Sequence, residues 1–183
     1  MAMSEGFVRA YGLHWFRTEV DWRRNGELFG RQKKQVTAMR LANFWNQTGI
    51  YILHDAYGAY YVGQAERQTL GERLRQHTED DHEEKWDRFS WFGFNAILTG
   101  RTQDGVYRIK TSRPKDLLGS TDRTIHEVEA LLIMTLGTHR AGNKHSEKFS
   151  SAEMWEQVWT SERDSFLDVA QRQALEQKGP MFR

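Results

Sequence analysis

The sequence predicts an α+β fold, because strand and helix patterns of hydrophobic residues alternate along the chain. The stretch from Gly49 to Gly63, GIYILHDAYGAYYVG, has two apolar segments around a glycine turn, which is typical of a β-hairpin. Apolar residues recur at helical spacing in residues 69–78 and again in residues 120–136. With 183 residues, of which 38% are hydrophobic, the chain is expected to form one compact domain with additional segments.

The elements follow in order along the chain. Residues 49–55 and 60–64 are the predicted strands of the hairpin, with Gly58 in the turn. Residues 69–78 form a predicted helix with Leu70 and Leu74 one turn apart. Residues 89–98, FSWFGFNAIL, are apolar on both faces, which favours a covered strand. A turn is expected at residues 104–105, because Asp-Gly is a strong turn signal.

The last third of the sequence predicts helices. One helix is expected to begin near residues 120–122 and to end at Leu136, where Gly137 provides a cap. The tail from Ser151 has apolar residues at helical spacing and is expected to cover the core as a C-terminal helical extension; these residues are Met154, Trp155, Val158, Trp159, Phe166, Leu167 and Ala170.

Composition limits the possible partners and chemistry. Lys and Arg number 26 against 25 Asp and Glu, so the net charge of +1 indicates no global attraction to a polyanion. Residues 1–47 are locally basic and rich in aromatic residues, and could be either an arm that contacts nucleic acid or an extension docked on the core. The chain has no cysteine, which excludes disulfides and thiolate chemistry. The absence of a long apolar run predicts a cytoplasmic protein without membrane association.

Residues 79–84, EDDHEE, contain five carboxylates. Acidic runs of this kind are usually hydrated surface loops, and this is the preferred interpretation. A metal cluster in this loop is the less favoured alternative.

Polar residues on the two central helices suggest chemistry. Helical periodicity places Glu129 on the same face as Ile125 and Leu132, so a carboxylate is predicted within the core stripe. A buried carboxylate must be protonated, paired or bound to a cation. The alternative is a Glu paired with an Arg at the edge of the core. On the earlier helix, Arg73 and His77 lie one turn apart beside the apolar face. A carboxylate, a guanidinium and an imidazole together could hydrolyse a phosphodiester.

Six positions in order resemble the GIY-YIG nuclease family. They are the triplets Gly49-Ile50-Tyr51 and Tyr61-Val62-Gly63, followed by Arg73, His77, Glu129 and Asn143. The match covers roughly residues 48–146, which leaves 1–47 as a basic, aromatic N-terminal extension and 147–183 as a C-terminal extension. The family includes repair nucleases, homing endonucleases and restriction enzymes. The resemblance implies a small antiparallel sheet of about three strands flanked by helices.

The resemblance also implies the roles of these residues. Glu129 would hold one divalent ion, Mg²⁺ with Mn²⁺ as a substitute, and Arg73 would stabilise charge on the phosphorane. Either Tyr51 or His77 would take the proton from the attacking water, with Tyr61 as an orienting group. Asn143 would bind a phosphate or support the hairpin. Arg75 remains an alternative to Arg73, because Arg73 lies twelve residues after Tyr61, a longer gap than is usual in the family.

The predicted function is therefore that of a metal-dependent DNA endonuclease acting in restriction, phage defence or repair. Single- and double-stranded DNA both remain candidate substrates, and double-strand cutting by one metal centre would require a homodimer, a second binding event or a partner protein. The alternative is an idle domain of the same type that binds nucleic acid or protein. The segment HEVEA at His126 lacks the second histidine of a zinc protease, and there is no serine elbow, so peptidase and esterase activities are not supported.

Overall fold

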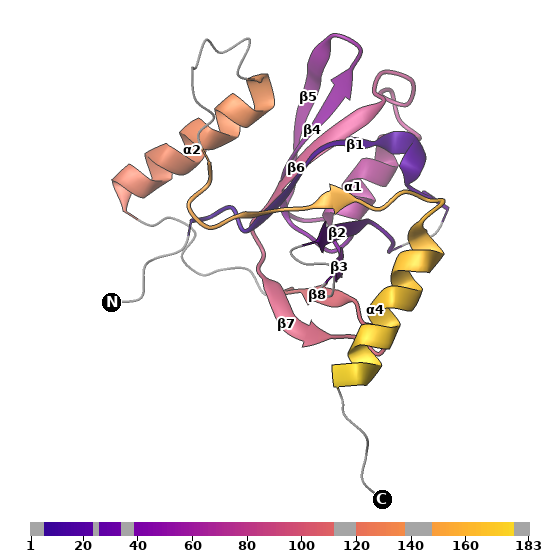
Figure 1. Cartoon of the computed structure of the whole chain (residues 1–183). Helices are drawn as coiled ribbons and strands as arrows, with labels where there is room; N and C mark the ends of the chain where they lie inside the picture. Colours follow the sequence, from indigo (N-terminus) through magenta and orange to yellow (C-terminus); the bar gives the residue numbers. More distant parts are fainter. Residues whose placement is uncertain (1–5, 24–25, 34–38, 112–119, 138–147, 178–183) are drawn as a thin grey trace, which may run out of the picture.

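The computed structural model describes residues 6–23, 26–33, 39–111, 120–137 and 148–177 and contains two five-stranded sheets (Figure 1). The order of strands in the first sheet is β5 (Gly58–Ala65), β4 (Gly49–Asp55), β6 (Arg88–Gly93), β1 (Ala10–Phe16) and β9 (Glu153–Met154). The order in the second is β10 (Glu156–Gln157), β2 (Phe29–Lys33), β3 (Met39–Asn43), β8 (Tyr107–Ile109) and β7 (Ile97–Arg101). Both sheets are mixed, because β1 pairs with β9 and β3 with β8 in parallel.

Three α-helices complete the described residues: α1 (Leu70–Gln76), α2 (Thr121–Leu136) and α4 (Arg163–Gln177). A short 3₁₀ helix, η1, follows β1 at Arg17–Glu19. None of these helices, in the part of the chain that is described, is long and apolar enough to cross a membrane.

The expected small sheet of about three strands is therefore wrong. The three predicted strands do pair, but β6 also pairs along its other edge with β1, which comes from the N-terminal segment. The segments 1–47, 48–146 and 147–183 each contribute strands to both sheets. The backbone N–H and C=O groups at the edge of a sheet have no partners within the sheet, and here strands that are distant in the sequence form hydrogen bonds with them. The sequence patterns of β1, β2 and β3 did not indicate strands.

The hairpin and the two central helices are confirmed. Strand β4 has the predicted limits, and α2 ends at the predicted residue. Helix α1 begins where the side chain of Thr69 accepts a hydrogen bond from the backbone N–H of Glu72, while the Glu72 carboxylate accepts one from the N–H of Thr69. This capping box satisfies two N–H groups that a helix leaves free at its start.

Two other predicted elements are corrected. The expected strand 89–98 ends at Gly93, and the chain passes at Asn95 into β7 of the second sheet. The expected helix from Ser151 is replaced by β9 and β10, and a helix begins only at Arg163. Trp155, between these two strands, is buried in the central core, and it contacts Phe44 edge-to-face with the ring centroids 5.0 Å apart. Burial of this large ring outweighs helical spacing as a determinant of local structure.

The core forms on both faces of the first sheet. On one face, Tyr51 and Leu53 of β4 pack with α1 and with residues of the second sheet. On the other face, Ile52 packs with Phe92 and with Ala130 of α2. Neighbouring residues of a strand point to opposite faces, so α1 and α2 lie on opposite sides of the first sheet. Helix α4 packs on the second sheet, against Met39 and Leu41 of β3. Helix α2 lies apart from the second sheet (Figure 1).

The side of the first sheet that faces α2 contains a buried histidine. The Nε2 atom of His54 lies 2.9 Å from the hydroxyl of Ser90, and its ring centroid lies 4.6 Å from that of His14. Burial, together with the neighbouring charges of His14 and Arg88, lowers the pKa of His54 to about 4. The folded protein therefore favours the neutral imidazole.

This pKa shift predicts loss of stability in acid. An unfolded His has a pKa near 6.5, so the contribution of His54 is complete above that pH and is lost as the pH falls towards 4. The loss should reach about 3 kcal/mol in the free energy of unfolding. In His54→Gln, the decline between pH 7 and pH 4 should be smaller by this amount when measured by urea unfolding. If the free energy of unfolding declined equally with pH in the two proteins, the lowered pKa of His54 would be contradicted.

Candidate functional site

Four of the predicted site residues meet between the β4–β5 hairpin and α1, on what we call the tyrosine face: Tyr51, Tyr61, Arg73 and His77. The hydroxyl of Tyr51 lies 2.7 Å from Nε2 of His77. The ring of Tyr61 has its centroid 5.2 Å from that of His77 and 6.3 Å from that of Tyr51. Strands β4 and β5 and the C-terminal end of α1 thus bring together residues that are separated by up to 26 positions.

A hydrogen-bonded chain connects this face to the loop after α1. Nδ1 of His77 lies 2.7 Å from Oδ2 of Asp80. An ionised carboxylate can only accept, so Nδ1 carries the proton and Nε2 accepts from the Tyr51 hydroxyl. Burial lowers the pKa of His77, and the hydrogen bond to Asp80 opposes this shift. The chain Tyr51–His77–Asp80 is therefore a neutral phenol, a neutral imidazole and a carboxylate.

The charges around the phenol are set by burial and by Arg73. Burial raises the pKa of Tyr51 to about 12, although the Arg73 guanidinium opposes the shift through its charge and a hydrogen bond. Tyr51 consequently stays protonated at neutral pH. Arg73 also donates to the Oε1 atom of Gln76 at 2.6 Å, which fixes the guanidinium on this side of the helix. Arg75 instead lines a separate cavity with Trp45, so the predicted preference for Arg73 agrees with the geometry.

Access to the tyrosine face differs among its members. Tyr51 is 0% exposed and His77 only 3% exposed. Tyr61 and Arg73 are half-buried. Tyr61 and Arg73 are therefore the accessible members of the tyrosine face, and Tyr51 and His77 lie beneath them.

Gly63 allows Tyr51 to occupy this position. A Cβ atom at residue 63 would lie 2.2 Å from Cζ and 2.3 Å from the hydroxyl oxygen of Tyr51. Gly63→Ala should therefore displace the ring, disturb its hydrogen bond to His77 and destabilise the protein by about 1–3 kcal/mol in denaturant unfolding. Gly100→Ala is the control, because a Cβ there meets nothing within 4 Å and should change stability by less than about 0.5 kcal/mol. Equal stability of the two variants would contradict the close packing.

Glu129 is not on the tyrosine face. The predicted core stripe of α2 is wrong: Ile125, Val128, Leu132 and Leu136 are 44–60% exposed, and Glu129 is exposed with them. The helix instead buries Glu127, Ala130 and Ile133. Because α2 lies on the opposite side of the first sheet from α1, Glu129 does not reach Tyr51 or His77. Its exposed carboxylate does not fit the metal site that the resemblance implies. Asn143 lies outside the described residues.

The buried carboxylate of α2 is Glu127, whose burial the helical periodicity did not predict. Its Oε1 atom accepts hydrogen bonds from the backbone N–H and the hydroxyl of Ser150, at 2.8 and 2.6 Å. Its Oε2 atom accepts one from the backbone N–H of Val8 at 3.3 Å. A Cβ at Gly6 would lie 2.4 Å from this carboxylate. Glu127 thus joins the N-terminal segment, α2 and the segment before β9.

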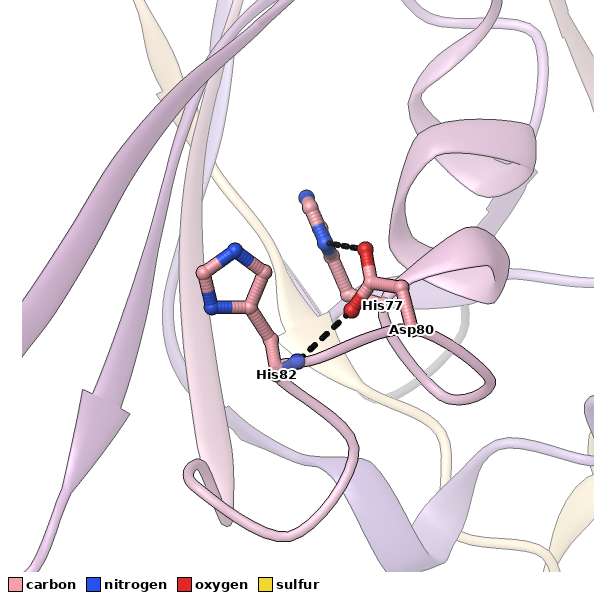
Figure 2. Close-up of side chains that lie close together, drawn as sticks. All are labelled: His77, Asp80 and His82. Carbon is pink, nitrogen blue, oxygen red and sulfur yellow. Dashed lines mark hydrogen bonds and ion pairs between the residues drawn. The ribbon is translucent and has the colours of Figure 1, made fainter.

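Two further functional candidates lie in the acidic loop, which was expected to be merely hydrated. Asp80 and His82 approach His77, and they are the members of the described chain that could hold a metal ion with it (Figure 2). The ring centroid of His82 lies 4.8 Å from that of Tyr61. The spacing His77-x-x-Asp80-x-His82 could have indicated these metal ligands. The neighbouring carboxylates instead favoured the interpretation as a hydrated acidic loop.

Comparisons with known proteins assign no family to the chain, because no family model, curated protein or solved structure matches it. The resemblance to the GIY-YIG nucleases therefore stays a prediction that depends on the residues named above.

Proposed function

We propose that this protein is an endonuclease that hydrolyses phosphodiester bonds in DNA at the tyrosine face, with a dependence on divalent ions that the family resemblance implies. The observation that carries the proposal is the convergence of Tyr51, Tyr61, Arg73 and His77, four of the six matched positions. These residues come from β4, β5 and α1, and the Tyr51 hydroxyl lies 2.7 Å from His77.

The side chains supply electrostatic stabilisation and positioning. Arg73 would bind a non-bridging phosphate oxygen and stabilise the charge that develops on phosphorus. Tyr61 would orient the scissile group or the attacking water through its phenol. Tyr51 and His77, the two alternative candidates for the general base, are buried and would instead hold Tyr61 and Asp80 in place. A divalent ion would add neutralisation of phosphate charge. Glu129 takes no part in these steps, because its side chain is exposed on a helix that lies on the other side of the sheet.

A second candidate function is a binding module that recognises nucleic acid or a protein without cutting it. The separation of Glu129 from the tyrosine face favours this candidate, because the family's metal ligand is then missing from the site. An Arg beside the half-buried ring of Tyr61 is also suited to stacking and phosphate contact. Both candidate functions use the tyrosine face to bind a ligand, but only the endonuclease would cleave DNA.

A substrate panel separates the two functions. Supercoiled, linear and single-stranded DNA should be incubated with the protein and Mg²⁺ or Mn²⁺, and the ends of any products mapped. The endonuclease is expected to yield 5′ phosphate and 3′ hydroxyl ends, by analogy with the family. If the protein is cytoplasmic, as the sequence predicts, cleavage should occur near neutral pH. Binding of DNA without any cleavage would support the module and overturn the enzyme.

Glu129→Ala adds a decisive comparison. With α2 placed as described, this variant should cleave as fast as the unmodified protein, because its side chain is exposed on the far side of the sheet. Loss of cleavage by orders of magnitude would mean that α2 brings Glu129 to the tyrosine face in the working protein.

A further inference from the structure

The loop that follows α1 brings three potential metal ligands together. One ligand atom each of His77, Asp80 and His82 lies within 4.8 Å of the other two (Figure 2). Oδ2 of Asp80 is 2.7 Å from Nδ1 of His77, and the ring centroids of His77 and His82 are 5.0 Å apart. The three residues lie within six consecutive positions, so the loop alone determines their arrangement.

We propose that His77, Asp80 and His82 bind a divalent transition-metal ion, with Zn²⁺ as the best fit. Two imidazoles and one carboxylate form a donor set that suits zinc and similar ions and leaves at least one coordination position open. Mg²⁺ prefers a shell made of oxygen donors and water, so it is not the expected occupant. The site therefore differs in ligands and in metal from the one that the family resemblance implies at Glu129.

The distances require only a small adjustment. Zinc binds nitrogen and carboxylate oxygen at about 2.0–2.2 Å in tetrahedral geometry, so two donors on one ion lie about 3.3–3.6 Å apart, whereas Nδ1 of His77 and Oδ2 of Asp80 now lie 2.7 Å apart and all three ligand atoms lie within 4.8 Å of one another. The side chain of His82 is half-buried and that of Asp80 is 39% exposed, so both can move towards an ion. His77 is held in the core and supplies the fixed donor. The ion would replace the proton that now lies between Nδ1 of His77 and Asp80.

Hydrogen bonds already orient two of the three ligands, Asp80 and His77. Oδ1 of Asp80 accepts a hydrogen bond from the backbone N–H of His82 at 2.8 Å, which turns Oδ2 towards His77. The indole N–H of Trp86 donates to the carbonyl of His77 at 3.0 Å and closes the loop. With the ion on Nδ1, the neutral ring would carry its proton on Nε2, which would then donate to the hydroxyl oxygen of Tyr51; a hydrogen bond donated by the other ring nitrogen is typical of metal-bound histidine.

The charge of the loop favours a cation. Four more carboxylates surround the site, and all of them are exposed: Glu79, Asp81, Glu83 and Glu84. Their summed field would raise the local concentration of divalent ions. These side chains are not ligands in the proposal; they make the approach of the ion favourable.

Zinc binding by this loop does not depend on the proposed nuclease activity. A role of the ion in DNA cleavage does rest on the proposed function. The ring of Tyr61 adjoins His82, so an ion in this site would lie on the accessible part of the tyrosine face. There it could contact a phosphate oxygen bound by Arg73.

The test is a zinc titration of the full chain without a polyhistidine tag and without nucleic acid, near neutral pH, against a chromophoric chelator. We expect one Zn²⁺ per chain, an increase in the melting temperature, and no displacement by a large excess of Mg²⁺. Asp80→Asn and His82→Ala change exposed or half-buried side chains and should each weaken binding by at least about 10- to 100-fold.

His126→Ala is the matched control, because it removes a histidine of α2 that is distant from the loop and should leave zinc affinity unchanged. Zinc binding that is equal in the unmodified protein and in a combined Asp80→Asn, His82→Ala variant would overturn the proposal. Because the assay contains no DNA, a failure of cleavage in the substrate panel would leave its result intact, and absent zinc binding would leave the endonuclease proposal standing.

Discussion

Replacing Arg73 with alanine is expected to slow DNA cleavage by about 10²–10³-fold. Loss of one preorganised donor that faces developing negative charge has an effect of this size. The change also removes the guanidinium that opposes the raised pKa of Tyr51. Arg73→Lys should recover part of the rate, since an ammonium keeps the charge but cannot form two parallel hydrogen bonds to a phosphate. The rate should be measured under single-turnover conditions with saturating DNA.

Arg75→Ala is the matched control for this experiment. The two arginines lie two positions apart on α1, but Arg75 lines a different cavity, with Trp45 and Gln68. Its replacement should alter the rate by less than about threefold, provided that both variants melt at similar temperatures. A rate that depends on Arg75 and not on Arg73 would show that substrate binds at another side of the helix.

Replacing Glu127 with alanine is expected to destabilise the protein by about 3–5 kcal/mol. The carboxylate is 0% exposed and accepts three hydrogen bonds from Val8 and Ser150. Its removal would leave a buried backbone N–H of Val8 without its partner and would remove the negative charge that faces Arg9. Breaking a buried charged network has a cost in this range. The free energy of unfolding should be measured in urea or guanidinium chloride.

Glu129→Ala is the control within the same helix. Its side chain is exposed, so its removal should change the free energy of unfolding by less than about 0.5 kcal/mol. Glu127→Gln should be intermediate, because it keeps an acceptor oxygen and loses the charge. A larger loss of stability at Glu129 than at Glu127 would mean that α2 is rotated by about half a turn from the orientation described.

Local patterns in the sequence were sufficient for the hairpin, α1 and α2. The glycine turn, the capping Thr69 and the terminal Gly137 act within a few residues of one another, so their effect can be read without knowledge of the rest of the chain. The gathering of Tyr51, Tyr61, Arg73 and His77 follows from these elements, because the hairpin leads directly into α1. Most of the tyrosine face could therefore be predicted.

Long-range pairing and helix orientation could not be read in this way. The pairing of β1 with β6 joins residues about 80 positions apart, and no pattern in either strand identifies the other. The orientation of α2 was misjudged because its most apolar stripe is exposed, while a carboxylate, Glu127, faces the core. A helical wheel assumes that the apolar side faces inwards, and it cannot include hydrogen-bond donors such as Val8 and Ser150, which come from distant segments.

The sequence by itself determined where the chain turns, where its central helices begin and end, and which phenols, guanidinium and imidazole share one face. Only the tertiary structure decided that two five-stranded sheets form, that Glu129 lies apart from the tyrosine face, and that Glu127 is the buried carboxylate of α2. The physical reason is that the first set depends on interactions between near neighbours. The second depends on which distant groups satisfy a sheet edge or a buried charge.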